Sequence, residues 1–419
     1  MKIAFVLGTL GLGGHTRSAV AIGRALQEIG HDIHVFGIDQ GGTNIVLHGG
    51  LPLTTAPRST GIFNCLHKSE KQAFVSFFNE FRPDVIHCFD YRALPLIKQY
   101  CGDNPIPVIW TICGGPVPHH TIPDMRPIVV FSEELRQGLH QHHRIPEEHL
   151  FINAARVELR KEIYRTAEER AFRTRHSLGE LPIVLLISRI ANTKLNAILH
   201  TIDAFETMGN SAHARLLIVG KVDSDVAFRK VKSAAEKTNS LLGESMVTVT
   251  SDGSEHASRL IPMSNIAIGV GRTAFESMYH GVPTLVIGEH GLSGVATSDT
   301  ASRMSVCNFS GRDARALPAS VRTPQATAKE LQHLLIDPDY ARTVGEDGRQ
   351  WVEGHLDSRK GAQFYDALYC CPEDFFLQPT QHSLRRLQRS FALRDLYHLL
   401  FPTRINNLVV LLRKRFGAI

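Results

Sequence analysis

The sequence has no recognisable arrangement of cysteines and no long apolar run. Its 419 residues contain seven scattered cysteines, none of them in a C-x-x-C pair. No stretch reaches the roughly 18 consecutive apolar residues that a membrane-spanning helix needs. These absences argue against a disulfide framework and a cysteine metal site, and they favour a cytoplasmic location. The apolar residues Ile3–Leu7 end at Gly8 without a small-residue cleavage site, so we interpret them as a buried strand rather than a signal peptide.

A dinucleotide fingerprint is also missing. Gly8, Gly11, Gly13 and Gly14 follow the first apolar run, but their spacing does not fit G-x-G-x-x-G, so a nicotinamide dehydrogenase is a poor match. A glycine-rich loop before a helix remains a general cradle for an anion or a sugar, since the first N–H groups of the helix are open. The alternative is a tight turn between strand and helix that binds nothing.

Short apolar runs alternate with longer amphipathic segments. This order predicts parallel sheets covered by helices on both faces, which is an α/β fold. The predicted strands are Ile3–Leu7, Asp32–Gly37, Val85–Cys88, Val108–Ile112, Pro127–Phe131, Ile183–Ile187, Ala214–Val219, Met246–Val249, Ile266–Val270 and Thr284–Ile287.

A charged stretch, poor in apolar residues, interrupts this order and predicts a boundary between two domains. We expect Rossmann-like, doubly wound domains over residues 1–165 and 178–355. A helix over 356–370 is expected to pack back on the first domain, followed by a tail over 371–419. Two such domains are expected to face a cleft, with ligands at the carboxyl ends of the strands.

Two segments of the second domain carry candidate binding groups. Arg189 and Lys194 lie between a predicted strand and helix, where two cations can clamp a diphosphate; solvated surface cations are the alternative. Glu276 lies one turn inside a predicted helix among apolar neighbours, and a carboxylate there can accept hydrogen bonds from a ribose diol or simply stabilise the helix. Further candidates surround these: Gly271, Arg272 and Thr273 at the start of that helix, and Glu289, His290 and Gly291 in a second glycine-rich loop.

Taken in order, these segments resemble the retaining nucleotide-sugar glycosyltransferases with two Rossmann-like domains, the GT-B architecture of the family-4 type. The resemblance covers roughly Met1 to Leu368. It rests on Gly13-Gly14 before a helix and on the segments VVFSEEL, FINAAR, SRIANTK, LLIVG and GRTAFESMYHGVP.

The resemblance implies roles for these residues. Arg189 and Lys194 would bind the donor diphosphate and assist its departure, and Glu276 would bind the ribose. Gly271, Arg272 and Thr273 would lie near the phosphate or the donor sugar. Gly13, Gly14 and His15 would line the diphosphate or the acceptor.

Some family positions differ here. The family pairs two glutamates eight positions apart, but Ile268 stands eight residues before Glu276, and Arg272 or Glu289 and His290 would substitute. Cys113 stands where the family often has a catalytic histidine. His119 would serve instead, with His120 beside it; exposed loop histidines are the alternative.

No metal or other cofactor is expected, because Arg189 and Lys194 would neutralise the leaving group. No D-x-D motif follows a strand of the first domain, and we interpret Asp223 and Asp225 as loop residues.

The tail carries the basic character of the chain. Residues 381–419 hold eight Lys or Arg and one acid, giving +7, so the net charge of +5 leaves about −2 for residues 1–380. Leu384 and Leu387 begin an apolar stripe of a basic amphipathic helix, which favours peripheral binding to an anionic membrane on its inner face. The alternative is a helix packed on the body or on a partner subunit. No nucleic-acid-binding module accompanies the charge.

The sequence therefore predicts transfer of a sugar from a nucleotide-diphosphate sugar to a glycan, lipid-linked or glycoconjugate acceptor, with retention of configuration. Two alternatives stay open. One is an epimerase-type or phosphorylase-like enzyme acting on a nucleotide sugar. The other is a non-catalytic subunit of a glycan assembly system that kept the fold.

Overall fold

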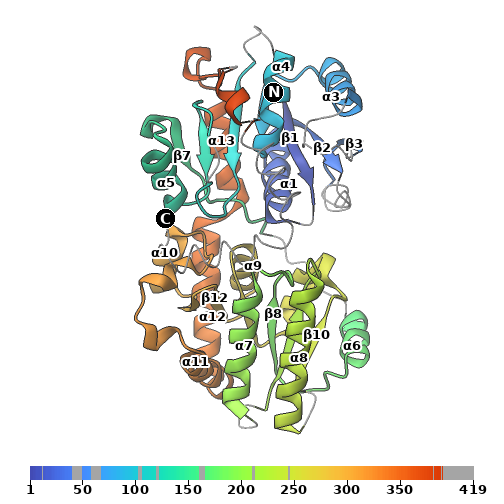
Figure 1. Ribbon diagram of the computed structural model, residues 1–419, viewed down its shortest axis with the longest axis vertical. Coiled ribbons are helices and arrows are strands. Elements are labelled where there is room, and N and C mark those ends of the chain that lie inside the picture. Colours follow the sequence, from blue (N-terminus) through green and yellow to red (C-terminus); the bar gives the residue numbers. More distant parts are fainter. Residues whose placement is uncertain are drawn as a thin grey trace. The chain divides into compact units, whose positions relative to one another are not determined.

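The computed structural model describes residues 1–11, 13–39, 50–57, 68–101, 106–118, 122–159, 166–209, 213–243, 246–380, 382–387 and 389. These form two compact units (Figure 1). The first holds the described residues within 1–130 and 135–152 and from Ala362 onward; the second holds 131–134 and those within 153–361. The units thus divide at Asn153 and again at Ala362, whereas the charged stretch in the sequence places the first boundary between 165 and 178.

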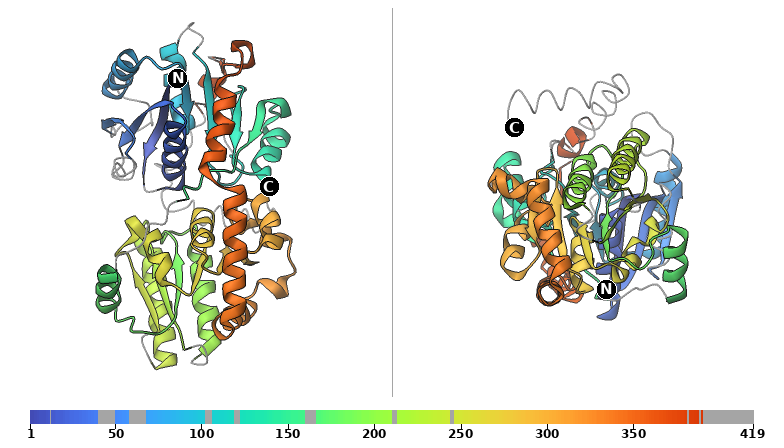
Figure 2. Two further views of the ribbon diagram at one scale, coloured as in Figure 1. Left: turned by 180° about the vertical axis from the view of Figure 1, so that it is seen from behind. Right: turned by 90° about the horizontal axis from the view of Figure 1, so that it is seen from below.

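The first unit is a seven-stranded parallel sheet in the order β3-β2-β1-β4-β5-β6-β7. Its strands are β1 (Lys2–Leu10), β2 (Asp32–Asp39), β3 (Leu53–Pro57), β4 (Val85–Cys88), β5 (Val108–Ile112), β6 (Ile128–Val130) and β7 (Leu150–Ile152). One face packs on α3 (Lys68–Phe81), α4 (Leu94–Cys101) and α5 (Glu133–His143). The other face packs on α1 (Gly14–Glu28) and on the part of α13 (Ser358–Tyr369) from Ala362 onward (Figures 1 and 2).

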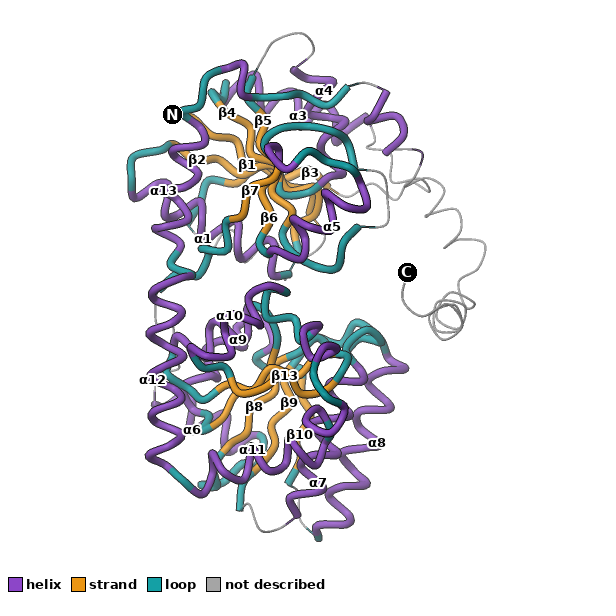
Figure 3. The backbone as a smooth tube through the Cα atoms, turned by 90° about the vertical axis from the view of Figure 1, so that its left-hand side faces the viewer, coloured by secondary structure: helices purple, strands orange, loops and turns teal. Residues whose placement is uncertain are grey.

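The second unit is a six-stranded sheet in the order β10-β9-β8-β11-β12-β13. Its strands are β8 (Ile183–Ile187), β9 (Arg215–Val219), β10 (Val247–Thr250), β11 (Ile266–Gly269), β12 (Thr284–Gly288) and β13 (Gly291–Val295). Its helices are α6 (Thr166–Arg175), α7 (Leu195–Met208), α8 (Asp225–Leu242), α9 (Arg272–Tyr279), α10 (Ser298–Val306), α11 (Pro324–Ile336) and α12 (Pro338–His355). Figure 3 shows the strands of each unit as one twisted layer with helices around it.

Burial on both faces explains why these strands are almost continuously apolar. In β8, Val184 and Leu186 face the core formed with α7, α8 and α11, while Ile183 and Leu185 face a separate core on the opposite side. A strand whose two faces are both covered has no solvent-facing positions for polar residues. The predicted α/β class with two doubly wound, Rossmann-like sheets is therefore confirmed.

Three short strands were not predicted. β3 and β7 are edge strands that are only partly buried, with Thr55 and Ile152 exposed, so they lack the continuous apolar run of the central strands. β13 was expected to be part of a glycine-rich loop, but Gly291–Val295 pairs antiparallel with β12. A glycine-rich strand at the edge of a sheet shows little apolar periodicity, so its pairing with the one neighbouring strand decides its structure.

The described start of the basic tail packs on the first unit. Leu384 and Leu387 are 2% and 0% exposed and belong to the core beside α3, α4 and α5. For these two leucines the structure shows the alternative, a helix packed on the body, since the core of the unit covers them. Apart from residue 389, the tail beyond 387 lies outside the described residues. Within the described parts of the chain, no helix is both long enough and apolar enough to cross a membrane.

Candidate active site

The candidate residues of the second unit gather at one edge of its sheet. The chain passes from β8 to β9 on one side and returns to β11 on the other, so strand order reverses between β8 and β11. In open α/β sheets, ligands bind outside the carboxyl ends of the strands at this point. The predicted residues follow the strands there: Arg189 and Lys194 after β8, Gly271, Arg272 and Thr273 after β11, and Glu289, His290 and Gly291 after β12.

Arg189 and Lys194 occupy the connection between β8 and α7. The Arg189 guanidinium is 61% exposed and lies 3.1 Å from the carboxylate of Asp223, which follows β9. Burial lowers the pKa of Lys194, and the positive charges of Arg189 and Arg312 lower it further, against an opposite effect of Glu289. A half-buried ammonium among other cations favours an anionic ligand, because an anion would relieve the repulsion.

Arg312 is a third cation at this edge that sequence reasoning did not identify. It begins the short helix Arg312–Ala316, and its Nε lies 2.8 Å from Oε1 of Glu134, while an NH2 group binds the other oxygen. Glu134 belongs to the VVFSEEL segment that carried part of the family resemblance. More than a hundred residues separate Arg312 from Lys194, so no local pattern could reveal their proximity.

Asp223 and Asp225 were both expected in a loop. Asp223 is in the connection between β9 and α8, where it pairs with Arg189. Asp225 instead begins α8, because Ser224 caps that helix by accepting a hydrogen bond from the N–H of Ala227.

The N-terminus of α9 is set by two glycines. Gly271 has φ +55 and ψ −119, a conformation that favours glycine, and its N–H donates to the carbonyl of Phe309 over 2.7 Å. A Cβ on Gly269 would lie 2.3 Å from the methyl of Thr273, so the Thr273 side chain packs on bare backbone. The first N–H groups of α9 point beyond the carboxyl end of β11, where helix geometry gives them no intrahelical partner.

Arg272 and Glu276 pair with each other along α9. Nε of Arg272 lies 2.7 Å from Oε1 of Glu276, and both side chains are 19% exposed. An NH group of Arg272 also donates to the carbonyl of Arg156 over 3.3 Å. Residues four positions apart on a helix are neighbours, so the sequence spacing already allows this pairing. From the sequence, Arg272 and Glu276 were nevertheless predicted as separate ligand contacts.

Ile268 stands where the resemblance would place the first of two glutamates. It lies in the middle of β11, is 1% exposed, and aligns with Leu186 on one side and Leu285 on the other. Since Val270 and Gly271 alone connect β11 to α9, the position eight residues before Glu276 falls inside the sheet. A side chain at this position is therefore enclosed in the core of the second unit.

The connection between β12 and β13 is a tight turn. Glu289 is exposed and His290 half-buried. Gly291 has φ +93, and a Cβ there would lie 2.2 Å from the carbonyl oxygen of Arg322. The need for glycine at 291 therefore comes from the packing of the chain on itself, whether or not a ligand approaches.

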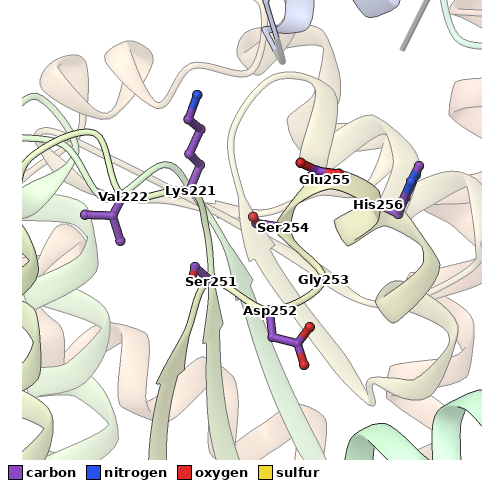
Figure 4. Close-up of a pocket in the computed structure, with 8 residues that line it drawn as sticks. All are labelled: Lys221, Val222, Ser251, Asp252, Gly253, Ser254, Glu255 and His256. Atoms are coloured by element: carbon purple, nitrogen blue, oxygen red, sulfur yellow. The ribbon is translucent and has the colours of Figure 1, made fainter. Parts of the chain in front are cut away.

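A pocket of about 530 Å³ lies on the same edge, beyond the ends of β9 and β10 (Figure 4). Its lining comes from two connections, with residues Lys221, Val222, Ser251, Asp252, Gly253, Ser254, Glu255 and His256. Asp252 pairs with His176 over 3.0 Å and with Arg175 at the end of α6, and the hydrogen bonds of these two partners lower its pKa. No sequence motif marked this pocket.

In the first unit, the glycine-rich connection from β1 to α1 lies at the corresponding reversal between β1 and β4. A Cβ on Gly13 would lie 2.8 Å from Nδ1 of His15, so a larger residue here would require the histidine ring to move. Gly14 has no atom within 4 Å of its hypothetical Cβ, which leaves that side of the backbone open. Nε2 of His15 lies 3.2 Å from Oγ1 of the buried Thr16. His119 and His120 lie outside the described residues.

Among the described residues, no group of three or more His, Cys, Asp or Glu side chains is arranged to hold a metal ion.

No family model and no curated protein matches this sequence. Solved structures do. The chain is similar to a glycosyltransferase from Rickettsia africae (TM-score 0.62, 14% identity, covering 88% of this chain and 97% of that one). It is also similar to Anabaena HepE in complex with UDP and glucose (TM-score 0.63, 15% identity, 88% and 99%). A third similar structure is the UDP-GlcNAc 2-epimerase from Neisseria meningitidis bound to UDP-GlcNAc (TM-score 0.54, 14% identity, 88% and 99%). At these identities the likeness establishes the fold, which is that of the GT-B glycosyltransferases.

Proposed function

We propose that this protein transfers a sugar from a nucleotide-diphosphate sugar to a glycan, lipid-linked or glycoconjugate acceptor, with retention of configuration and without a metal. The observation that carries the proposal is the strand reversal of the second unit. Arg189 and Lys194 lie on one side of it and the N-terminus of α9 on the other. Both features attract a diphosphate, in a fold shared with structures that hold UDP or a UDP-sugar.

The same groups can serve the chemistry. As the bond between the anomeric carbon and the diphosphate breaks, negative charge grows on the departing phosphate. Cations and helix N–H groups already fixed in position stabilise that charge without reorganising. Because burial and neighbouring cations lower the pKa of Lys194, we expect a bound diphosphate to raise that pKa.

The nucleoside has two candidate contacts. The pocket beyond β9 and β10 lies on the same edge as the cations and is the proposed site of the base (Figure 4). Glu276 would accept hydrogen bonds from the ribose, while Arg272 holds its carboxylate in one orientation. In the first unit, the open side of Gly14 and the ring of His15 are the proposed acceptor contacts.

Two alternatives have specific support. The similarity to an epimerase that binds UDP-GlcNAc favours a nucleotide-sugar epimerase, which would use the same diphosphate site. The internal pairing of Arg272 with Glu276 and the core position of Ile268 favour a non-catalytic subunit. Product analysis separates these, because transfer requires an acceptor, epimerisation does not, and a non-catalytic subunit gives no product.

The first experiment is thermal unfolding with UDP, GDP, ADP and dTDP and their sugars. A ligand at 100 times its Kd stabilises the protein by about 2.7 kcal/mol. We expect one nucleotide to raise the Tm of the wild type, and Lys194→Met to abolish this increase. Lys237→Met is the matched control, since its ammonium is 69% exposed on α8 and pairs with Glu206. If no nucleotide changes the wild-type Tm, the proposed function is wrong.

A further inference from the structure

Arg156 is a charged residue in an apolar setting. It is 4% exposed, and its guanidinium carbon lies 4.0 Å from the ring centre of Phe131 and 5.1 Å from that of Phe275. The guanidinium also donates to the carbonyl of Ala154 and to Oδ1 of Asn308. Burying a guanidinium costs free energy that these contacts must offset. The contacts of Arg156 therefore indicate which neighbouring segments it holds in place.

One route leads from Arg156 to the start of α9 through Asn308. Asn308 and Phe309 are two successive non-glycine residues with positive φ, at +56 and +51. Such a pair is strained unless neighbouring contacts hold it. The strained conformation presents the carbonyl of Phe309 to the N–H of Gly271, and the contact to Arg156 holds Asn308 by its side chain.

A second route is direct. The backbone carbonyl of Arg156 accepts a hydrogen bond from Arg272, which in turn holds Glu276. The ring of Phe275 contacts both the guanidinium of Arg156 and the ring of Phe309, whose centre is 5.1 Å away in an edge-to-face contact. Gly271, Arg272 and Phe275 are thus each held by Arg156 or by the segment that it fixes.

We propose that Arg156 is a positioning residue that fixes the first turn of α9, and with it Arg272 and Glu276, without touching a ligand. The inference about the helix rests on geometry, while its consequence for ligand binding rests on the proposed function. A preorganised first turn would present its N–H groups and the Glu276 carboxylate without an ordering cost when the nucleotide binds. A less ordered first turn would bind the nucleotide with a higher Kd, because part of the binding free energy would be used to order it.

The test compares Arg156→Lys with Arg126→Lys. Lysine keeps the charge but loses the planar fork that serves two acceptors and stacks on rings. Arg126 is a matched control in the first unit: it lies 4.7 Å from the ring of Phe375 and donates to backbone carbonyls of Phe375 and Asp374. Hydrogen exchange is followed in peptides from α9 and, for comparison, from β8 and β9.

We expect Arg156→Lys to speed exchange of amides in 270–276 about tenfold, with β8 and β9 unchanged, and Arg126→Lys to leave all three segments unchanged. The Kd of the nucleotide found in the thermal screen should rise about tenfold in Arg156→Lys alone. Asn308→Gly is the second variant, because it permits the left-handed backbone while removing the acceptor of Arg156; it should loosen the same peptide.

Unchanged exchange at 270–276 in both variants, or equal loosening of β8 and β9, would overturn the positioning role. Local loosening in a protein whose wild type binds no nucleotide would support the positioning role and reject the proposed function. Local loosening with an unchanged Kd would show that the turn is not part of the nucleotide site, and would overturn the consequence for binding.

Discussion

Acidification should destabilise the first unit through one buried histidine. His87 lies on β4 and is fully buried, with Nδ1 2.6 Å from the hydroxyl of Tyr369 on α13 and Nε2 2.7 Å from Oγ1 of Thr111 on β5. Burial lowers the pKa of His87 to about 3. The ring therefore stays neutral in the folded unit across the range in which a histidine in an unfolded chain becomes protonated.

The direction and magnitude of this change in stability follow from the difference in proton binding between the folded and the unfolded chain. Below the unfolded pKa of about 6.5, the unfolded chain binds a proton that the folded unit does not, so stability is lost as the pH falls from about 6.5 toward 3. The loss is about 1.4 kcal/mol per pH unit, or about 2 kcal/mol between pH 6.5 and 5. Burial also lowers the pKa of His34 on β2, which adds to the loss in the same direction.

The two tryptophans allow the first unit to be followed by itself. Trp110 is 1% exposed on β5, next to Thr111, and Trp351 is on α12 of the second unit. In a Trp351→Phe background, fluorescence reports the first unit, and urea unfolding at pH 7.5, 6 and 5 gives its stability. His87→Gln is the test variant, since glutamine retains hydrogen-bonding groups but does not titrate.

We expect His87→Gln to be less stable at pH 7.5 and to lose less stability on acidification, by about 1.4 kcal/mol per unit below pH 6. Other titrating groups contribute equally to both proteins and cancel in the difference. Parallel pH dependences with and without His87 would refute the reasoning, because His87 would then titrate alike in the folded and unfolded chain.

Three glycine substitutions test the effect of an added Cβ, one at a crowded position and two at open positions. Gly291→Ala should lower the Tm of the second unit, because its Cβ would meet the carbonyl of Arg322 at 2.2 Å. Gly354→Ala is the control: its Cβ would have no atom within 4 Å, so the Tm should be unchanged or slightly higher. Equal Tm values for the two variants would contradict the packing argument. Gly14→Ala should also fold normally, since the space beside it is open. If Gly14 approaches a substrate, its alanine variant should raise the KM for the acceptor in a transfer assay, and an unchanged KM would remove it from the acceptor site.

The sequence by itself predicted the fold class and most strands of both sheets. Runs such as Val85–Cys88, Val108–Ile112 and Ile183–Ile187 appear as strands with the predicted bounds, because a strand buried on both faces must be continuously apolar. The positions of Arg189 and Lys194 between a strand and a helix were equally local, and the alternation of strands and helices placed them at the carboxyl edge of the sheet.

Only the tertiary structure decided which charged and buried residues contact one another. The pairing of Arg312 with Glu134, the buried setting of Arg156 and the core position of Ile268 all depend on segments far apart in the chain. A pattern within one segment reports burial and periodicity, whereas the partner of a charge is set by how the connections after different strands meet at one edge. For this protein, the sequence therefore predicted the edge of the sheet where a ligand is expected, and the packing around α9 decided how the candidate residues there are held.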